Sequence, residues 1–170
     1  TSSPSFQISS ISDEKLSTIF SKELDIFGLK IYATPATSDN DIVHAGKIFA
    51  EYLDNDEDGE VDDQEVLASL KNENASLIMF KDEEELERTD LDILDGINGN
   101  FQDLYGTETH PNGSVLNEFD ASLEEILHLI SDNGYSQVYP DAFSTKDTSR
   151  LTEAMDTARG GKFLQTPNSY

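Results

Sequence analysis

The stretch SDNDIVHAGKIFAEYLDNDEDGEVDDQEVLASLKN, residues 38–72, decides the fold expected for this chain. Its first half begins with Ser38, a suitable helix N-cap, and then repeats apolar residues at helical spacing. These residues are Ile42, Ala45, Ile48, Phe49 and Tyr52. After an acidic interruption the same spacing resumes through Val66, Leu67 and Leu70. The pattern predicts two helices joined by an acidic loop.

The loop itself, DNDEDGEVDDQE at residues 54–65, combines side chains that carry oxygen ligands with two residues, Gly59 and Val61, whose side chains carry none. Counted from its first residue, acidic side chains stand at positions 1, 3, 5, 7, 9 and 12. They are Asp54, Asp56, Asp58, Glu60, Asp62 and Glu65. Gly59 permits a sharp turn, and Val61 is placed to enter the core. A solvated acidic loop would explain the acids, but not the glycine and the valine between them.

Over residues 40–72 this pattern resembles the EF-hand calcium-binding module. The resemblance implies that the first three aspartates bind the ion through their side chains. Glu60 would offer its backbone carbonyl, Asp62 would act through a water, and Glu65 would close the shell with both oxygens. No second loop of this kind occurs in the sequence, whereas EF-hands usually occur in pairs. The resemblance therefore implies a structural or extracellular calcium site.

A weaker resemblance concerns the segment EEILH, which ends at His128. It is similar to the HExxH helix of zinc metallopeptidases, with Glu124 in place of the first histidine. The resemblance implies zinc ligands at Glu124 and His128 and a catalytic base at Glu125, with Glu153 and His110 as further ligands. The alternative is that the two glutamates are first-turn acids that favour the helix dipole. In that case His128 packs at the edge of an ordinary helix.

Composition limits the partners that the chain can have. There are 11 Lys and Arg against 35 Asp and Glu, which gives a formal charge of −24. Nucleic acid and anionic membrane surfaces would repel such a protein, so neither is expected as a partner. The chain has no cysteine and no apolar run of membrane-spanning length. Its beginning, TSSPSFQ, is typical of a processed secreted protein, and an extracellular location is expected.

The remaining patterns favour one domain over residues 1–170, of the α+β class and mostly helical, after a loose lead-in at residues 1–12. Further helices are predicted at 13–22, 119–134 and 149–159, strands at 27–34 and 77–80, and a helical turn at 82–88. Residues 95–114 read as loop. In the helix predicted at 119–134, Ser122 and Glu125 fit an N-terminal capping box. Gly134 is predicted to end this helix.

The leading functional hypothesis is an extracellular calcium-binding protein with a structural or partner-binding role. Its partners would be calcium and a protein or small molecule that the sequence does not identify. The alternative is a zinc-dependent hydrolase, active or decayed, with a structural calcium site. A third class, an acidic protein of mineral or matrix settings, is disfavoured because the acids alternate with apolar stripes. The sequence has no phosphate-binding glycine loop, no Gly-x-Ser-x-Gly and no cysteine nucleophile.

Overall fold

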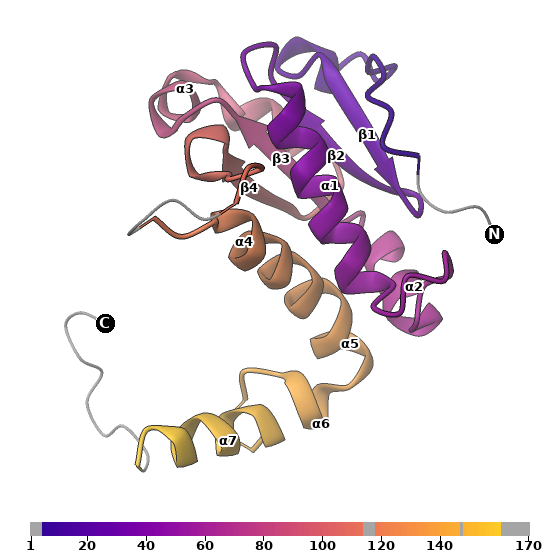
Figure 1. The fold of residues 1–170 in the computed structure, drawn as a ribbon, viewed down its shortest axis with the longest axis vertical. Coiled ribbons are helices and arrows are strands. Elements are labelled where there is room, and N and C mark those ends of the chain that lie inside the picture. The colour runs from indigo at the N-terminus through magenta and orange to yellow at the C-terminus, as the bar shows by residue number, and fades with distance from the viewer. Residues whose placement is uncertain (1–4, 114–117, 147, 161–170) are drawn as a thin grey trace.

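The computed structural model describes residues 5–113, 118–146 and 148–160. Its centre is a four-stranded mixed sheet with the strand order β1-β2-β3-β4. The strands are β1 Lys22–Ile26, β2 Leu29–Ala33, β3 Ser76–Phe80 and β4 Phe101–Tyr105. β1 and β2 form an antiparallel hairpin, and β2, β3 and β4 run parallel to one another. The predicted α+β class is confirmed (Figure 1).

Helices connect the parallel strands and continue after the last of them. Those among the described residues are α1 Asp39–Leu53, α2 Gln64–Asn72, α3 Glu83–Arg88, α4 Ala121–Ile130, α5 Ser136–Val138, α6 Pro140–Phe143 and α7 Arg150–Ala158. Shorter turns are η1 Leu16–Thr18, η2 Leu91–Gly96, η3 Gly106–Glu108 and the π-helical turn η4 Ser131–Tyr135. None of the described helices is both long and apolar enough to cross a membrane.

The sheet separates two apolar clusters, and β3 contributes to both because successive side chains of a strand point to opposite faces. Leu77 and Met79 join the larger cluster, which includes the apolar stripes of α1, α2 and α4. Ile78 and Phe80 join the smaller cluster, formed with residues of η1 and η2. All five residues of β3 are buried, as expected for a central parallel strand covered on both faces.

Several sequence predictions are confirmed. α1 follows the N-cap Ser38, whose hydroxyl accepts the N–H of Asn40. α2 resumes after the acidic loop, and Val61 is 7% exposed, within the larger cluster. The predicted strand at 77–80 is β3, the core of the strand predicted at 27–34 is β2, and the final helix is α7 with Ser149 as its N-cap.

Two elements were predicted wrongly. The helix expected at 13–22 is only the short turn η1, and the chain then enters β1, where pairing with β2 outweighs the local helical spacing. The loop expected at 95–114 contains β4, which pairs in parallel with β3. Only one residue of β4, Leu104, is buried, so the strand lacks the apolar run that would reveal it.

The boundaries of α4 also differ from those predicted. Its N-cap is Asp120, which accepts the N–H of Ser122, so Ser122 lies inside the helix. Gly134 does not stop the chain from coiling, because η4 and α5 follow directly. A Cβ at Gly134 would lie 2.8 Å from Cγ1 of Val66. The glycine is therefore needed for the close approach of η4 to α2.

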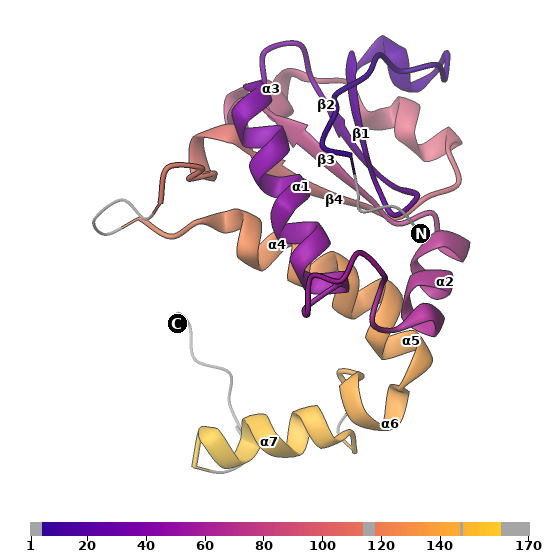
Figure 2. The same cartoon turned by 45° about the vertical axis from the view of Figure 1, so that its right-hand side comes forward.

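The helices after α4 leave the body of the molecule. α5 contacts α2 and η4, α6 contacts α5 and η4, and α7 has its main contacts with α6. Figures 1 and 2 show α7 separated from α4 in both views.

Candidate metal centre

The acidic loop is held between two helix ends. α1 ends at Leu53, and Asp54 is its C-cap residue. Asp63 is the N-cap of α2, where its side chain accepts the N–H groups of Glu65 and Val66. The hydroxyl of Tyr139 also donates to Asp63, at 2.7 Å. The bond from Val66, with those from Tyr139 and Glu65, holds the pKa of Asp63 below its ordinary value against the opposing effect of burial.

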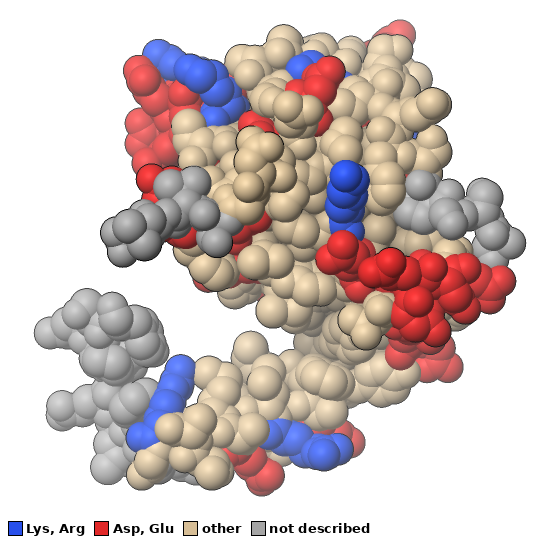
Figure 3. Space-filling model, viewed as in Figure 1, with Lys and Arg blue, Asp and Glu red and all other residues tan. Residues whose placement is uncertain are grey.

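Asp54, Asp56 and Asp58 form a group that can hold a metal ion. One carboxylate oxygen from each lies within 4.8 Å of the other two. Asp54 is 6% exposed, whereas Asp56 and Asp58 are exposed to solvent. Figure 3 shows acidic side chains gathered over the end of α1 and the loop that follows it.

The backbone of the loop turns around the buried carboxylate of Asp54. Its two oxygens accept the N–H groups of Asp58, at 3.1 Å, and of Gly59, at 2.9 Å. Gly59 has φ +88°, which glycine adopts without the steric cost that a Cβ brings, as the sequence predicts. Glu57 also has a positive φ, of 58°. For a residue with a side chain, this conformation costs about 1–2 kcal/mol.

The three carboxylates repel one another in the absence of a cation. Two unit charges 4 Å apart interact with about 1 kcal/mol in water and about 4 kcal/mol near a protein surface. The N–H groups that reach Asp54 offset part of this repulsion, but they leave outer oxygens of Asp56 and Asp58 facing solvent. A bound cation would remove the remaining repulsion.

The other predicted calcium ligands lie around this group but not in it. Asp62 accepts the N–H of Asn55 at 3.0 Å, and its own N–H donates to the carbonyl of Leu53. Glu60 is exposed and donates its N–H to Asp58. Glu65 lies in the first turn of α2 with its side chain exposed. The structure thus brings together the first three of the six predicted ligands.

The predicted zinc ligands are more widely spread. His110, Glu124 and the predicted base Glu125 line one cavity of about 500 Å³. His128 is on the same face of α4 as Glu124, with 3.5 Å between its Nε2 and Oε1 of Glu124, but it does not line that cavity. Glu153 lies on α7, away from α4 (Figure 2). Within the described ranges, three potential ligands come within 4.8 Å of one another only in the aspartate group.

Glu125 is partly buried, whereas its neighbour Glu124 is exposed. Burial raises its pKa above the ordinary value, although His128 and the hydrogen bond from Gln102 oppose this shift. Nε2 of Gln102 donates to Oε2 of Glu125 at 2.6 Å. Gln102 belongs to β4, the strand that the sequence did not reveal.

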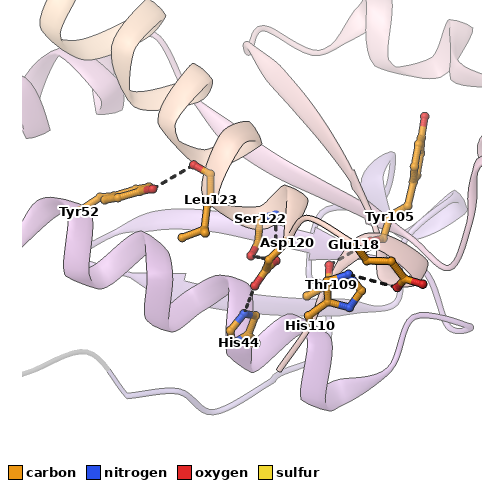
Figure 4. Close-up of polar contacts among 9 residues, drawn as sticks. All are labelled: His44, Tyr52, Tyr105, Thr109, His110, Glu118, Asp120, Ser122 and Leu123. Atoms are coloured by element: carbon orange, nitrogen blue, oxygen red, sulfur yellow. Dashed lines mark hydrogen bonds and ion pairs between the residues drawn. The ribbon is translucent and has the colours of Figure 1, made fainter. Parts of the chain in front are cut away.

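Sequence reasoning missed the contact between His44 and Asp120, which Figure 4 shows. Nε2 of His44 on α1 lies 2.6 Å from Oδ2 of Asp120, and the other oxygen of Asp120 accepts from the N–H and the hydroxyl of Ser122. Burial alone would raise the pKa of Asp120, but the bonds from Ser122 and His44 outweigh it, and the pKa lies below its ordinary value. The two partners are 76 residues apart, so only the spacing Asp-x-Ser at the helix start could have indicated an N-cap here.

His110 lies near this pair from another segment. Its side chain is 9% exposed, and its Nε2 is 3.6 Å from Oε2 of Glu118 (Figure 4). Burial raises the pKa of Asp41 on α1, and His44 and His110 both act against that shift. His44 therefore joins α1 to the start of α4, and His110 contacts Glu118 in the segment that leads into α4.

No protein-family model matches this chain, and no significant match to a curated protein or a solved structure was found.

Proposed function

We propose that this protein binds calcium through the loop at residues 54–65, as a structural element or as support for a partner, in an extracellular setting. The observation that supports the proposal most is the group formed by Asp54, Asp56 and Asp58. These residues stand at the first, third and fifth positions of the EF-hand pattern in the sequence.

The donor set favours calcium over other cations. Every predicted ligand is a carboxylate or carbonyl oxygen, which suits a hard cation, whereas zinc prefers histidine and cysteine. Magnesium demands near-ideal octahedral geometry and keeps several waters, while calcium accepts six to eight oxygens in flexible arrangements. A loop with two residues at positive φ and several exposed carboxylates suits the more tolerant ion.

The set of ligands around the calcium ion would be completed by a side chain at the start of α2. Glu65, the last residue of the loop, is exposed in the first turn of α2, and a change of its side-chain rotamer would bring a fourth carboxylate toward the ion. Asp62 accepts the N–H of Asn55 across the loop and would contact the ion through a water. Closure of this shell would fix the end of α1 relative to the start of α2.

Replacement of Glu65 with Gln tests the ligand assignment. We expect the variant to bind calcium at least about a hundredfold more weakly, because a neutral amide cannot supply a second anionic oxygen to the ion. Calorimetric titration of the chelator-treated protein measures the affinity and should give one site for the wild type. Glu51→Gln is the matched control, since Glu51 is an exposed α1 glutamate outside the loop. Equal affinities of the wild type and the Glu65 variant would refute the assignment.

A second candidate function is favoured by the cavity that His110, Glu124 and Glu125 share. In this alternative the protein is a zinc-dependent hydrolase, with Glu125 as the base and with Glu118 as an additional ligand. Glu118 lines the same cavity and lies 3.6 Å from His110. The sequence did not single out Glu118.

Metal analysis of the purified protein separates the two candidates. If the hydrolase proposal holds, we expect about one equivalent of zinc, lost in His110→Ala, because imidazole is a preferred zinc ligand. His128→Ala is the informative comparison, since His128 lies on the helix but does not line the cavity. A protein that retains calcium alone after dialysis against both metals would contradict the hydrolase proposal and leave the calcium site unaffected.

A further inference from the structure

The exposed apolar surface of this protein is concentrated in its last third. Among the described residues, every large apolar side chain that is exposed lies between residues 119 and 155. Three lie on or just before α4, with exposed fractions of 62% for Phe119, 39% for Leu123 and 50% for Leu127. Two lie on α7, Leu151 at 38% and Met155 at 39%. Apolar patches of this kind on a soluble protein usually mark an interface.

The apolar side of α7 is only partly covered within the described residues, where Leu151 and Met155 stay exposed. No residue of this helix is buried, and its main contacts are with the short helix α6. Isolated helices of fewer than about 12–15 residues are marginal in water, and α7 has nine. The N-cap bond from Thr152 to Ser149 fixes its start but supplies no apolar packing. A partner surface packed on Leu151 and Met155 would stabilise this short helix.

The stripe on α4 is the complementary surface, but the two do not meet within one chain. Leu123 and Leu127 are four residues apart and so share one face of α4, as Leu151 and Met155 do on α7. Figures 1 and 2 show the two helices apart, and Figure 3 shows the molecule hollowed between them. Each chain thus presents two separate exposed apolar faces.

The last part of the chain, residues 140–170, differs in formal charge from residues 1–139; we call the two parts the C-terminal arm and the body. Residues 140–170 contain four Lys and Arg and four Asp and Glu, so the arm is formally neutral. Residues 1–139 contain the remaining seven Lys and Arg and 31 Asp and Glu, and they carry the whole formal charge of −24. At 100° per residue, Arg159, the C-cap residue of α7, lies beside the apolar face of the helix. Glu118 and Glu124, both more than half exposed, lie beside the stripe of α4.

We propose that two copies of this chain form a symmetric dimer by exchange of α7. The face with Leu151 and Met155 of each copy covers the stripe with Phe119, Leu123 and Leu127 of the other copy. Arg159 then approaches the acidic edge of that stripe. Two-fold symmetry makes this contact twice, so both exposed faces of both chains are buried. A neutral arm placed against an acidic body avoids the repulsion that would oppose direct contact between two bodies.

Sedimentation equilibrium of the full chain at physiological salt, from low to high micromolar concentration and with or without calcium, tests the proposal. We expect a concentration-dependent dimer of twice 18.8 kDa. Leu151→Asp and Leu127→Asp should each weaken dimerisation by at least about tenfold, because a charge would be buried in both contacts of the dimer. Thr157→Asp is the matched control, since it adds the same charge to α7 at an exposed position away from Leu151 and Met155. Far-UV circular dichroism should show all three variants folded.

A mixture of the two interface variants tests whether α7 of each copy packs on α4 of the other copy. A heterodimer of Leu151→Asp with Leu127→Asp has one contact with both changes and one contact with neither. An equimolar mixture should therefore dimerise more strongly than either variant alone. A wild type that stays monomeric throughout would overturn the proposal. So would a dimer insensitive to both changes, a mixture no stronger than its components, or a cross-link between α4 and α7 within one chain.

Discussion

Saturating calcium is expected to raise the midpoint of thermal unfolding of the chelator-treated protein by roughly 5–10 °C. A ligand that binds only the native state at a hundred times its Kd stabilises that state by about 2.7 kcal/mol. For a chain of 170 residues, each kcal/mol shifts the midpoint by about 2–4 °C. The physical source of the effect is relief of repulsion among Asp54, Asp56 and Asp58, whose oxygens lie within 4.8 Å of one another. Thermal scans by circular dichroism at increasing calcium concentration measure the shift.

The control for this experiment is Glu65→Gln at the same calcium concentrations. Its midpoint without calcium should match that of the wild type, because the side chain of Glu65 is exposed. Its response to calcium should be largely lost. Magnesium at equal concentration should produce a smaller shift, since it dehydrates reluctantly. A wild-type midpoint that does not respond to calcium would count against the proposed function.

Phe49→Ala is expected to reduce the free energy of unfolding by about 3–5 kcal/mol. Phe49 is fully buried on the core face of α1, in the larger apolar cluster. The substitution removes an aromatic ring from a close-packed site and leaves a cavity that the surrounding strands and helices cannot fill completely. Urea unfolding followed by circular dichroism measures the loss.

Phe119→Ala provides the matched comparison, because it removes the same ring from a side chain that is 62% exposed. Measured at concentrations where the protein is monomeric, it should change the stability by about 0.5 kcal/mol or less. If the two variants lost equal stability, the assignment of Phe49 to the core would be wrong. The pair separates the effect of burial from the effect of side-chain type.

The elements that were predicted correctly carry their own local signals. The stripe from Ile42 to Tyr52 and the N-cap Ser38 define α1 without reference to the rest of the chain. β3 was visible because it is buried on both faces and is therefore continuously apolar. β4 was not visible, because its mixed residues become a strand only by pairing with β3. The helix predicted at 13–22 failed for the same reason, since β1 exists through its pairing with β2.

The candidate sites also differ in whether their residues come from one short segment or from distant segments. The aspartate group comes from alternate positions of one short loop, so its members are near one another in any compact turn. The zinc hypothesis joined residues from three distant segments, and the structure places His110 and Glu124 in one cavity but Glu153 on α7. The contacts between His44 and Asp120 and between Asp63 and Tyr139 each span 76 residues. No local pattern predicts such pairs.

The acidic loop, its turn at Gly59, the helices on either side and the acidic charge that limits the partners can all be read from the sequence. These properties depend on residues within a few positions of one another or on composition. The strand order, the His44–Asp120 contact and the separation of α4 from α7 appear only in the folded chain. The physical reason is that these features arise where distant segments meet, and the free energy of packing and pairing there outweighs local preference.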